Sequence, residues 1–574
     1  MNKDKIKITI GKKVIETVPG RTIFEVARDN GINIPGLCQH DDLCVKANCR
    51  LCLVEIEGQK GVHTSCSVEA KEGMVVHYQT PQVYHLRRQN LELILGQHKI
   101  ECHDCVLRGR CALLNYAKQF GAKINKYPLR KKKNTIYDFG PSIHFDQDKC
   151  IDCHNCVEMC QRQQVGFYDI EKREDFFEVC PTKDNKRDCI YCGQCIVHCP
   201  VGAIEGGGEF ENSEDFLKEK DKVVLVAFAP AIRATIGELF NLPYGSLVTG
   251  HIISGLKKMG IKNVFDVSSG ADVTTIEEVN ELVGRIKENK NLPMFSSCCP
   301  AWVKWVEFYA PQWIPNFTSA RSPQIMLGGL LKNYWAAKNG LSPKAVSVVT
   351  VMPCVAKKYE IKRPELAIDG IAPVDYVLTT RELAWVFKKN RVDLRKIAPD
   401  EALSELCRPS GAGVIYGRSG GVTESAFRTA YEILAGKELK DFKFVPHAKI
   451  KNCYVCKAKA GKVELRACAV NTMESAVQVL EEIKNNPGLY HYVEFMACHD
   501  GCIGGGGNPL PVSPKIRKAR IEALKLADNT CPVRSAHKNP DVQMLYDGYL
   551  KEEANRKKIL HTYYAKKERE TKIK

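Results

Sequence analysis

The 574-residue chain lacks the hydrophobic segments of membrane and secreted proteins. Its N-terminal stretch, MNKDKIKITIGKKV, mixes charged with apolar residues and has no apolar signal-peptide core. The apolar run VVLVAFAPAI at 223–232 is far shorter than a membrane span and contains Pro230. We therefore expect a cytoplasmic protein that makes no use of a membrane.

Two recognition patterns are also missing. No G-x-G-x-x-G fingerprint follows a strand, which argues against a nicotinamide site in this chain. The formal net charge is +17, but the basic residues are dispersed and no aromatic-plus-basic pattern indicates nucleic-acid binding. Two interpretations of the charge stay open: a solvated basic surface, or a surface that docks an acidic protein. Bound iron–sulphur clusters would offset part of it, since each four-thiolate cluster contributes roughly −2.

Cysteine, in contrast, is abundant, with 27 residues. Disulfide scaffolds are typically small secreted proteins, whereas this chain is long and has no secretion signal. The cysteines are therefore better explained as metal ligands. The length also requires several domains, and the cysteine spacing indicates where they lie.

The first cysteine group follows a predicted β-hairpin at 6–10 and 14–18 and a capping box of Thr22 and Glu25 at the start of a short helix. Its intervals suit a [2Fe–2S] centre, and its members are Cys38, Cys49, Cys52 and Cys66. Cys44 lies inside the first interval, and we interpret it as a spare buried thiol.

The second group lies in residues 84–125, which we predict to be helical. Lone histidines are usually packed or solvated side chains, but His98 stands just upstream of a C-x2-C-x5-C run, Cys102, Cys105 and Cys111. This position favours a [4Fe–4S] cluster with one histidine ligand. A neutral imidazole in place of a thiolate makes a cluster less negative and raises its reduction potential.

The strongest local signal is the run C-x2-C-x2-C-x3-C, which occurs twice and is followed by Pro200. It is the pattern of bacterial two-cluster ferredoxins, in which the fourth cysteine of each run ligates the other cluster. Structural zinc uses C-x2-C pairs but not this doubled pattern. Cys180 falls outside it and is interpreted as a free thiol. The eight predicted ligands are Cys150, Cys153, Cys156, Cys160, Cys189, Cys192, Cys195 and Cys199.

A polar, glycine-rich stretch at 206–222 reads as a linker, and beyond it apolar strands alternate with helices. This alternation predicts an α/β domain with a parallel sheet, whose sites lie where strands end. Four cysteines there suffice for a further [4Fe–4S] cluster and leave one thiol for chemistry. The five candidates at strand ends are Cys298, Cys299, Cys354, Cys498 and Cys502.

Three segments in this region carry a resemblance. SSCCPAW at 296–302, MPCVAKKYE at 352–360 and EFMACHDGCIGGGG at 494–507 resemble the signature segments of the [FeFe]-hydrogenases. Residues 1–210 resemble that family's accessory-cluster region and also the large iron–sulphur subunit of respiratory complex I. The resemblance implies reversible reduction of protons to H₂ at an H-cluster. This is a [4Fe–4S] cluster joined to a diiron azadithiolate unit with CO and CN ligands.

The resemblance also implies residue roles. Cys299, Cys354, Cys498 and Cys502 would hold the cubane, with Cys502 bridging to the diiron unit. Glycines 504–507 would let the backbone approach the cofactor. Lys357 would donate a hydrogen bond to a cyanide. Met352 and Met496 would form soft apolar walls, although core packing also explains them. The other implied pocket positions are Pro230, Ala231, Pro323, Gln324 and Gly417.

A proton path is implied as well. Cys298 would exchange protons with the bridging amine, as a thiol near its usual pKa of about 8.5 is able to do. The path would continue outward through Glu278, Thr318, Glu281 and Arg285. The helical spacing of Glu278, Glu281 and Arg285 also fits a simple exposed charged face. The sequence departs from the family's usual residues at Thr318, Ala231, Asp500 and Asn508.

The resulting organisation has five parts and five clusters: one [2Fe–2S], three accessory [4Fe–4S] and the H-cluster. The parts are a β-grasp [2Fe–2S] domain at 1–80, a helical His/Cys₃ [4Fe–4S] domain at 81–125, a two-[4Fe–4S] ferredoxin-like domain at 139–209, an α/β H-cluster catalytic domain with parallel sheets at 210–513 and a C-terminal small-subunit-like segment at 514–574.

The expected partners are H₂, protons, maturation proteins that supply the diiron unit, and ferredoxin or another electron carrier. An alternative is the hydrogen-activating subunit of an NAD(P)-linked or electron-bifurcating hydrogenase, with partner subunits. A non-catalytic hydrogen sensor is disfavoured because Cys298 is present and no signalling domain is visible. No cofactor role is assigned to Cys407, Cys531 or the predicted hairpin cysteines Cys453, Cys456 and Cys468, for which spare thiols are favoured over a metal or redox site.

Overall fold

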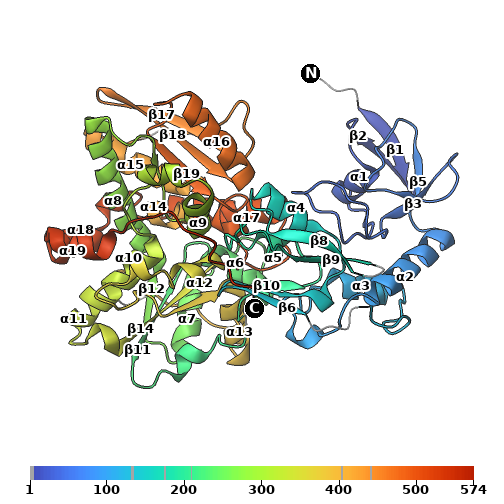
Figure 1. Cartoon of the computed structure of the whole chain (residues 1–574), viewed down its shortest axis with the longest axis horizontal. Helices are drawn as coiled ribbons and strands as arrows, with labels where there is room; N and C mark the ends of the chain where they lie inside the picture. The colour runs from blue at the N-terminus through green and yellow to red at the C-terminus, as the bar shows by residue number, and fades with distance from the viewer. Residues whose placement is uncertain are drawn as a thin grey trace.

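A computed structural model of the chain describes residues 5–130, 135–173, 176–208, 210–401, 405–439 and 442–573. The blue N-terminal part lies at one end of the molecule, the teal part with the doubled cysteine motif lies in the middle, and the larger green-to-red part forms the other end (Figure 1). Within those ranges, every helix is too short or too polar to span a lipid bilayer.

The N-terminal part is a five-stranded mixed sheet with a helix against it. The predicted hairpin is confirmed, with β1 (Ile6–Ile10) antiparallel to β2 (Lys13–Thr17). β1 also pairs in parallel with β5 (Val75–His77), which gives the order β2-β1-β5-β3-β4 with β3 (Leu53–Ile56) and β4 (His63–Thr64). The predicted capping box of Thr22 and Glu25 starts α1 (Ile23–Asp29), whose apolar face packs on the sheet.

The following cysteine-rich part is built from short elements. Two helices, α2 (Pro81–Leu95) and α3 (Ala112–Gln119), flank the 3₁₀ turn η1 (Cys102–Asp104). The doubled cysteine motif is carried by two short helices and two small antiparallel sheets. These are α4 (Asn155–Arg162), α5 (Gln194–His198), β6 (Ile136–Phe139), β7 (Ile143–Asp146), β8 (Tyr168–Arg173), β9 (Phe176–Pro181) and β10 (Ile204–Gly206).

The third part confirms the predicted parallel sheet. Its strands run in the order β12 (Asn263–Asp266), β11 (Val223–Phe228), β14 (Val346–Met352), β15 (Tyr376–Thr379), and every pair is parallel. All seven residues of β14 are buried, as expected for a strand covered on both faces. The predicted linker at 206–222 is only partly a linker, because it forms η3 (Asp215–Lys218) and buries Phe216 in this core.

A second sheet faces the first across the site. Its order is β13 (Met294–Phe295), β19 (Tyr492–Met496), β18 (Val463–Asn471), β17 (Cys453–Ala460) and β16 (Val445–Pro446), with β13, β19 and β18 parallel and β17 antiparallel. The predicted hairpin of Cys453 and Cys468 is therefore confirmed. Because the cysteine turns follow directly after β13, β14 and β19, one region collects all five candidates.

Helices cover both sheets and connect their strands. They are α6 (Ile232–Thr235), α7 (Thr249–Lys258), α8 (Val267–Glu288), α9 (Pro300–Tyr309), α10 (Pro323–Leu330), α11 (Ala336–Lys338), α12 (Ala356–Glu360), α13 (Thr380–Lys389), α14 (Gly411–Val414), α15 (Gly421–Ala435) and α16 (Met473–Asn485).

The C-terminal segment wraps back over the molecule. It contains α17 (Pro514–Asn529), α18 (Pro540–Asp547) and α19 (Glu553–Leu560). Beyond α19 the chain forms isolated bridges at His561 with Ala320 and at Ile573 with Phe139. The C-terminus accordingly lies beside β6 and β10 in Figure 1. This segment therefore ties the cysteine-rich part to the two-sheet part.

Candidate active site and cluster sites

A cavity with an empty volume of about 740 Å³ lies where strands of the two sheets end. Nearly all of its lining is apolar or sulphur-bearing. Every pocket position predicted from the sequence lines it, namely Pro230, Ala231, Cys298, Cys299, Pro323, Gln324, Met352, Cys354, Lys357, Gly417, Met496, Cys498 and Cys502. Segments more than 200 residues apart in the chain thus converge on one site.

The four predicted cubane ligands are close to one another; Cys498 is buried, and Cys299, Cys354 and Cys502 are half-buried. Burial, followed by the charges of Cys354 and Cys299, raises the pKa of the Cys498 thiol well above its usual range. The same causes raise the pKa of Cys502. Four thiols in such surroundings resist ionisation unless a cation neutralises them, which is the situation of cysteines that bind a metal cluster. The donor set therefore fits a cubane.

The glycine run at 504–507 is required by contacts among protein atoms. A Cβ on Gly505 would lie 2.3 Å from the Pro353 carbonyl oxygen, and one on Gly504 would lie 2.2 Å from that of His499. A Cβ on Gly506 would meet the backbone of Gly193, between two cysteines of the doubled motif. Gly505 also lines the cavity. The run thus packs the cysteine turn tightly against the Cys354 turn and against the neighbouring cysteine-rich part.

Lys357 is held by a carboxylate that sequence reasoning missed. Its Nζ donates to both oxygens of Glu360, at 3.0 and 2.9 Å, and to the Cys298 carbonyl at 3.1 Å. Glu360 also accepts from the Gln324 amide at 3.1 Å and from Ser322. Glu360 therefore fixes two polar side chains of the cavity. Its place three residues after Lys357 on α12 was the available signal.

The predicted proton face lies on α8 beside Cys298. Glu278 is fully buried, and burial raises its pKa to about 8, so it carries its proton near neutral pH. Tyr492 donates to Glu278 Oε2 at 2.7 Å. Burial, and then the charge of Glu278, raises the pKa of the Cys298 thiol, which is therefore further from its usual value than the sequence suggested. A fully buried Glu278 rules out the alternative of a simple exposed charged face.

The outer part of this face is a connected set of hydrogen bonds. Glu281 Oε2 accepts from Thr318 Oγ1 at 2.8 Å, and Glu281 Oε1 accepts from Arg285 at 2.6 Å. The four predicted members beyond Cys298 thus lie together, although the structure shows no direct hydrogen bond between Glu278 and Thr318 among the described side chains. Sequence reasoning missed Tyr416, which lines the cavity and bonds to Thr275 at 2.8 Å.

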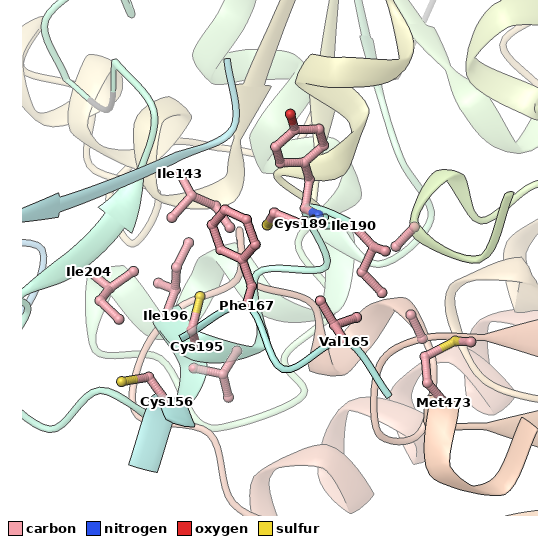
Figure 2. Packing of buried hydrophobic residues seen from close by; sticks show 14 of the residues in the cluster. Ile143, Cys156, Val165, Phe167, Cys189, Ile190, Cys195, Ile196, Ile204 and Met473 are labelled. Carbon is pink, nitrogen blue, oxygen red and sulfur yellow. Dashed lines mark hydrogen bonds between the residues drawn. The ribbon is translucent and has the colours of Figure 1, made fainter. Parts of the chain in front are cut away.

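The eight cysteines of the doubled motif lie in two groups of four, and each group contains the fourth cysteine of the other run. Cys150, Cys153 and Cys156 share a small cavity with Cys199, the fourth cysteine of the other run. Burial, and then the charges of Cys195, Cys160 and Cys192, raises the pKa of Cys189, which places the remaining four together. Figure 2 shows Cys156, Cys189 and Cys195 among Ile143, Val165, Phe167, Ile190, Ile196 and Ile204, an apolar shell suited to a cluster.

The first cysteine group also converges. The sulphurs of Cys38 and Cys49 are 3.5 Å apart, and those of Cys52 and Cys66 are 3.3 Å apart. The charges of Cys38 and Cys49 both act on Cys66, so the two pairs are neighbours. The interpretation of Cys44 as a buried thiol is wrong: Cys44 is exposed, and its sulphur accepts from Arg162, because its loop runs along the surface of α4.

His98 lines one cavity with Cys102, Cys105 and Cys111, and its empty volume is about 780 Å³. The ring is buried and its Nδ1 lies 2.7 Å from the Lys149 carbonyl oxygen. Because a carbonyl only accepts, Nδ1 carries the proton and Nε2 has the lone pair. This is the usual arrangement of a metal-binding histidine.

Replacing His98 by cysteine tests this assignment. We expect His98→Cys to retain the cluster but to lower its reduction potential, since an anion replaces a neutral ligand. Redox titration followed by EPR measures the shift. His85→Cys, an equal change on the exposed face of α2, is the control and leaves the potential in place. An unchanged potential in His98→Cys would exclude His98 as a ligand.

The cysteine-rich part and the cavity meet directly. The Cys498 thiol donates to the Cys192 carbonyl oxygen, with an Sγ···O distance of 3.9 Å. Nearby, Arg517 of α17 donates to both oxygens of Asp42 at 2.8 and 2.9 Å, beside His198 and His40. The turns of three different cysteine groups are therefore joined at one junction.

The three hairpin cysteines do not form one site. Cys453 and Cys468 have sulphurs 3.2 Å apart and belong to one buried cluster, whereas Cys456 belongs to another. Side chains alternate across a strand, so Cys453 and Cys456 point to opposite faces of β17. This arrangement excludes a three-thiolate metal site and favours packing.

Together, these sites define an iron–sulphur redox protein with a cysteine-lined apolar cavity. Comparisons identify its family. Residues 222–506 match the model of the iron only hydrogenase large subunit, C-terminal domain, and 514–567 match the iron hydrogenase small subunit. Residues 3–81 match a 2Fe-2S iron-sulfur cluster binding domain, and 149–203 match a 4Fe-4S dicluster domain.

Two relatives match nearly the whole length of the chain. It is 35% identical to the NADP-reducing hydrogenase subunit HndD of Solidesulfovibrio fructosivorans, over 98% of this chain and 99% of that protein. Iron hydrogenase 1 of Clostridium pasteurianum is 34% identical over 95% and 97%. A variant of [FeFe]-hydrogenase HydA1 from Chlamydomonas reinhardtii superposes with a TM-score of 0.57 at 32% identity, covering 62% of this chain and 98% of that one. The chain belongs to the iron-only, or [FeFe], hydrogenase family and is an oxidoreductase acting on hydrogen.

Proposed function

We propose that the chain catalyses 2H⁺ + 2e⁻ ⇌ H₂ in the cavity between its two sheets. The observation that carries the proposal is the convergence of Cys298, Lys357 and the four cubane cysteines on one buried apolar cavity. When bound there, the H-cluster supplies the metal centre at which protons and electrons combine. The cavity residues bind it, orient it and exclude water.

Each lining residue has a role that follows from its surroundings. Cys299, Cys354, Cys498 and Cys502 would hold the cubane, with Cys502 shared with the diiron unit. Lys357, positioned by Glu360, presents an ammonium group to an anionic ligand in a dry site, where charge-assisted hydrogen bonds are strong. Met352 and Met496 supply polarisable apolar walls. Pro230, Ala231, Pro323, Gln324 and Gly417 complete the wall.

Protons reach this cavity along α8. Cys298 holds its proton because it is buried, and Glu278 behind it holds one near neutral pH, with a pKa of about 8. Two neighbouring groups that are both protonated, each able to accept when the other donates, suit a relay. Glu281, Thr318 and Arg285 continue the route toward the surface.

Electrons would reach the cavity through the cysteine-rich parts. We infer one [2Fe–2S] cluster in residues 1–80, a His/Cys₃ [4Fe–4S] cluster in 81–125 and two [4Fe–4S] clusters in 139–209, ahead of the H-cluster domain at 210–513 and the segment at 514–574. The contact of Cys498 with Cys192 supports this order, because it joins the cubane turn to a ligand turn of the doubled motif.

The electron carrier is ferredoxin or a partner subunit. The name of the relative HndD, an NADP-reducing hydrogenase subunit, favours a multi-subunit NAD(P)-linked or bifurcating complex as the second candidate. The net charge of +17 suits an acidic carrier in either case. We also propose a cytoplasmic location, where cysteines stay reduced.

The proposal is tested by expression with and without the hydrogenase maturation proteins. Without them we expect reconstituted protein to bind about five clusters, seen by iron analysis and EPR, and to produce no H₂. With them, H₂ production and uptake appear while the accessory signals stay the same. Stoichiometric zinc in place of iron, or the absence of H₂ turnover after maturation, would contradict the proposal.

A further inference from the structure

A hydrogen-bonded branch leaves Glu281 toward the C-terminal segment. Glu281 Oε2 accepts from the Ser319 backbone N–H and from Ser319 Oγ, both at 2.9 Å. The same hydroxyl lies 2.9 Å from His561 Nδ1, and His561 Nε2 lies 2.9 Å from Glu277 Oε2. Glu277 and Glu281 are one turn apart on α8, so this branch links them through a histidine from the end of α19.

The donors and acceptors of the branch define where a proton is held. The Ser319 hydroxyl donates to Glu281, and it therefore accepts from His561 Nδ1–H. On the other side of the ring, the Glu277 carboxylate accepts from Nε2–H. Both hydrogen bonds of the ring are made when each ring nitrogen carries a proton. Nδ1–H is then placed to release its proton to Ser319 Oγ. Tyr546 donates to the other oxygen of Glu277 and steadies it.

Arg285, which forms an ion pair with Glu281, is unable to perform this exchange. A guanidinium group in a protein stays protonated, so Arg285 neutralises and orients Glu281 but neither takes up nor delivers a proton. Histidine exchanges protons between about pH 5 and 8. The His561 side chain is also 26% exposed, which brings it into contact with solvent.

We propose that His561 and Ser319 carry protons between solvent and Glu281. During H₂ production, the Nδ1 proton of the imidazole moves to Ser319 Oγ while the hydroxyl proton moves to Glu281 Oε2, and a solvent proton then replaces the one that the ring has lost. No electrons move in these steps, and H₂ oxidation reverses them. Glu277 and Tyr546 position the ring, and Arg321 holds the His561 carbonyl at 2.7 Å. The inference rests on the proposed function, because Glu281 matters only if the path from Cys298 operates.

The test uses matured full-length His561→Gln. Its amide keeps hydrogen-bonding capacity but neither takes up nor releases a proton. We expect H₂ production to fall by roughly tenfold, less than the loss of a sole acid–base group, because water near Glu281 remains a slower route. Added imidazole should restore turnover, because it supplies the exchangeable proton that the variant lacks. The control is His447→Gln, a distant histidine that also pairs with a glutamate, Glu482.

Two serine variants separate a relay from a merely structural role. Ser319→Ala keeps the backbone N–H bond to Glu281 but removes the hydroxyl that links Glu281 to His561. We expect its rate of H₂ production to fall as much as that of His561→Gln. Ser319→Thr keeps the hydroxyl and should keep the wild-type rate. Infrared carbonyl and cyanide bands should be unchanged in all of them. Wild-type rates in both His561→Gln and Ser319→Ala, or a loss in His561→Gln that imidazole does not relieve, would overturn the relay. Full turnover in Cys298→Ala and Glu278→Gln would instead remove the path from Cys298 on which this relay depends, and absence of H₂ turnover in the matured wild-type protein would contradict the proposed function itself.

Discussion

Cys298→Ala should lower H₂ turnover by about 10³-fold in both directions while the H-cluster remains assembled. Cys298 lines the cavity but is not one of the four cubane cysteines, so its loss removes no ligand. A methyl group carries no proton, and Glu278 behind it would then have no partner on the cavity side. Cys298→Asp should retain more activity than the alanine variant, because a carboxyl group relays protons, with a pH optimum moved by its lower pKa.

The matched control is Cys299→Ala, one residue along. It removes a proposed ligand, so it should damage cubane assembly and remove the infrared carbonyl and cyanide bands, whereas Cys298→Ala keeps them. Turnover and infrared spectra are measured on the same matured samples. Normal bands with near wild-type turnover in Cys298→Ala would exclude the relay. Loss of its bands would instead make Cys298 a structural residue.

Glu278→Gln should lower turnover by roughly 10²- to 10³-fold, because the amide preserves the shape and the Tyr492 hydrogen bond but neither takes up nor releases a proton. The same substitution should not lower the free energy of unfolding near pH 8. The folded pKa of Glu278 is about 8, above the value of about 4.3 in an unfolded chain, so this group costs stability as pH rises through that window. The glutamine variant should therefore melt no lower than wild type at pH 8.

Thermal unfolding across pH separates the two effects of Glu278→Gln. Wild-type stability should fall more steeply than that of the variant between about pH 5 and 8. A variant that melts well below the wild type at every pH would show that lost turnover reflects a damaged fold. Full turnover with an intact fold would remove Glu278 from the proton route.

Much of the architecture could be predicted because its signals are local. Alternating strands and helices predicted the parallel sheet of β11, β12, β14 and β15, and two apolar runs around a glycine turn predicted the hairpin of β1 and β2. Cysteine spacing predicted the grouping of the doubled motif, including the placement of Cys199 beside the first run. These features depend on residues close together in the sequence.

The residues that sequence reasoning missed act across long distances. Ser319 and His561 are 242 positions apart, and Glu238 receives a buried pair of hydrogen bonds from Arg520 across 282 positions. Nothing local marks such partners. Glu360 lay within reach of prediction, but its contact with Gln324 depends on how α10 packs against α12. The prediction that Cys44 is buried was wrong, because the burial of a side chain depends on how distant segments pack around its loop.

Infrared spectroscopy of the matured wild-type protein shows whether the cavity holds an H-cluster that turns over H₂. We expect carbonyl and cyanide bands in protein matured under anaerobic conditions, their change on exposure to H₂, and no such bands in Cys299→Ala. A matured wild-type protein that contains its iron–sulphur clusters but shows none of these bands would rule out an H-cluster in this cavity.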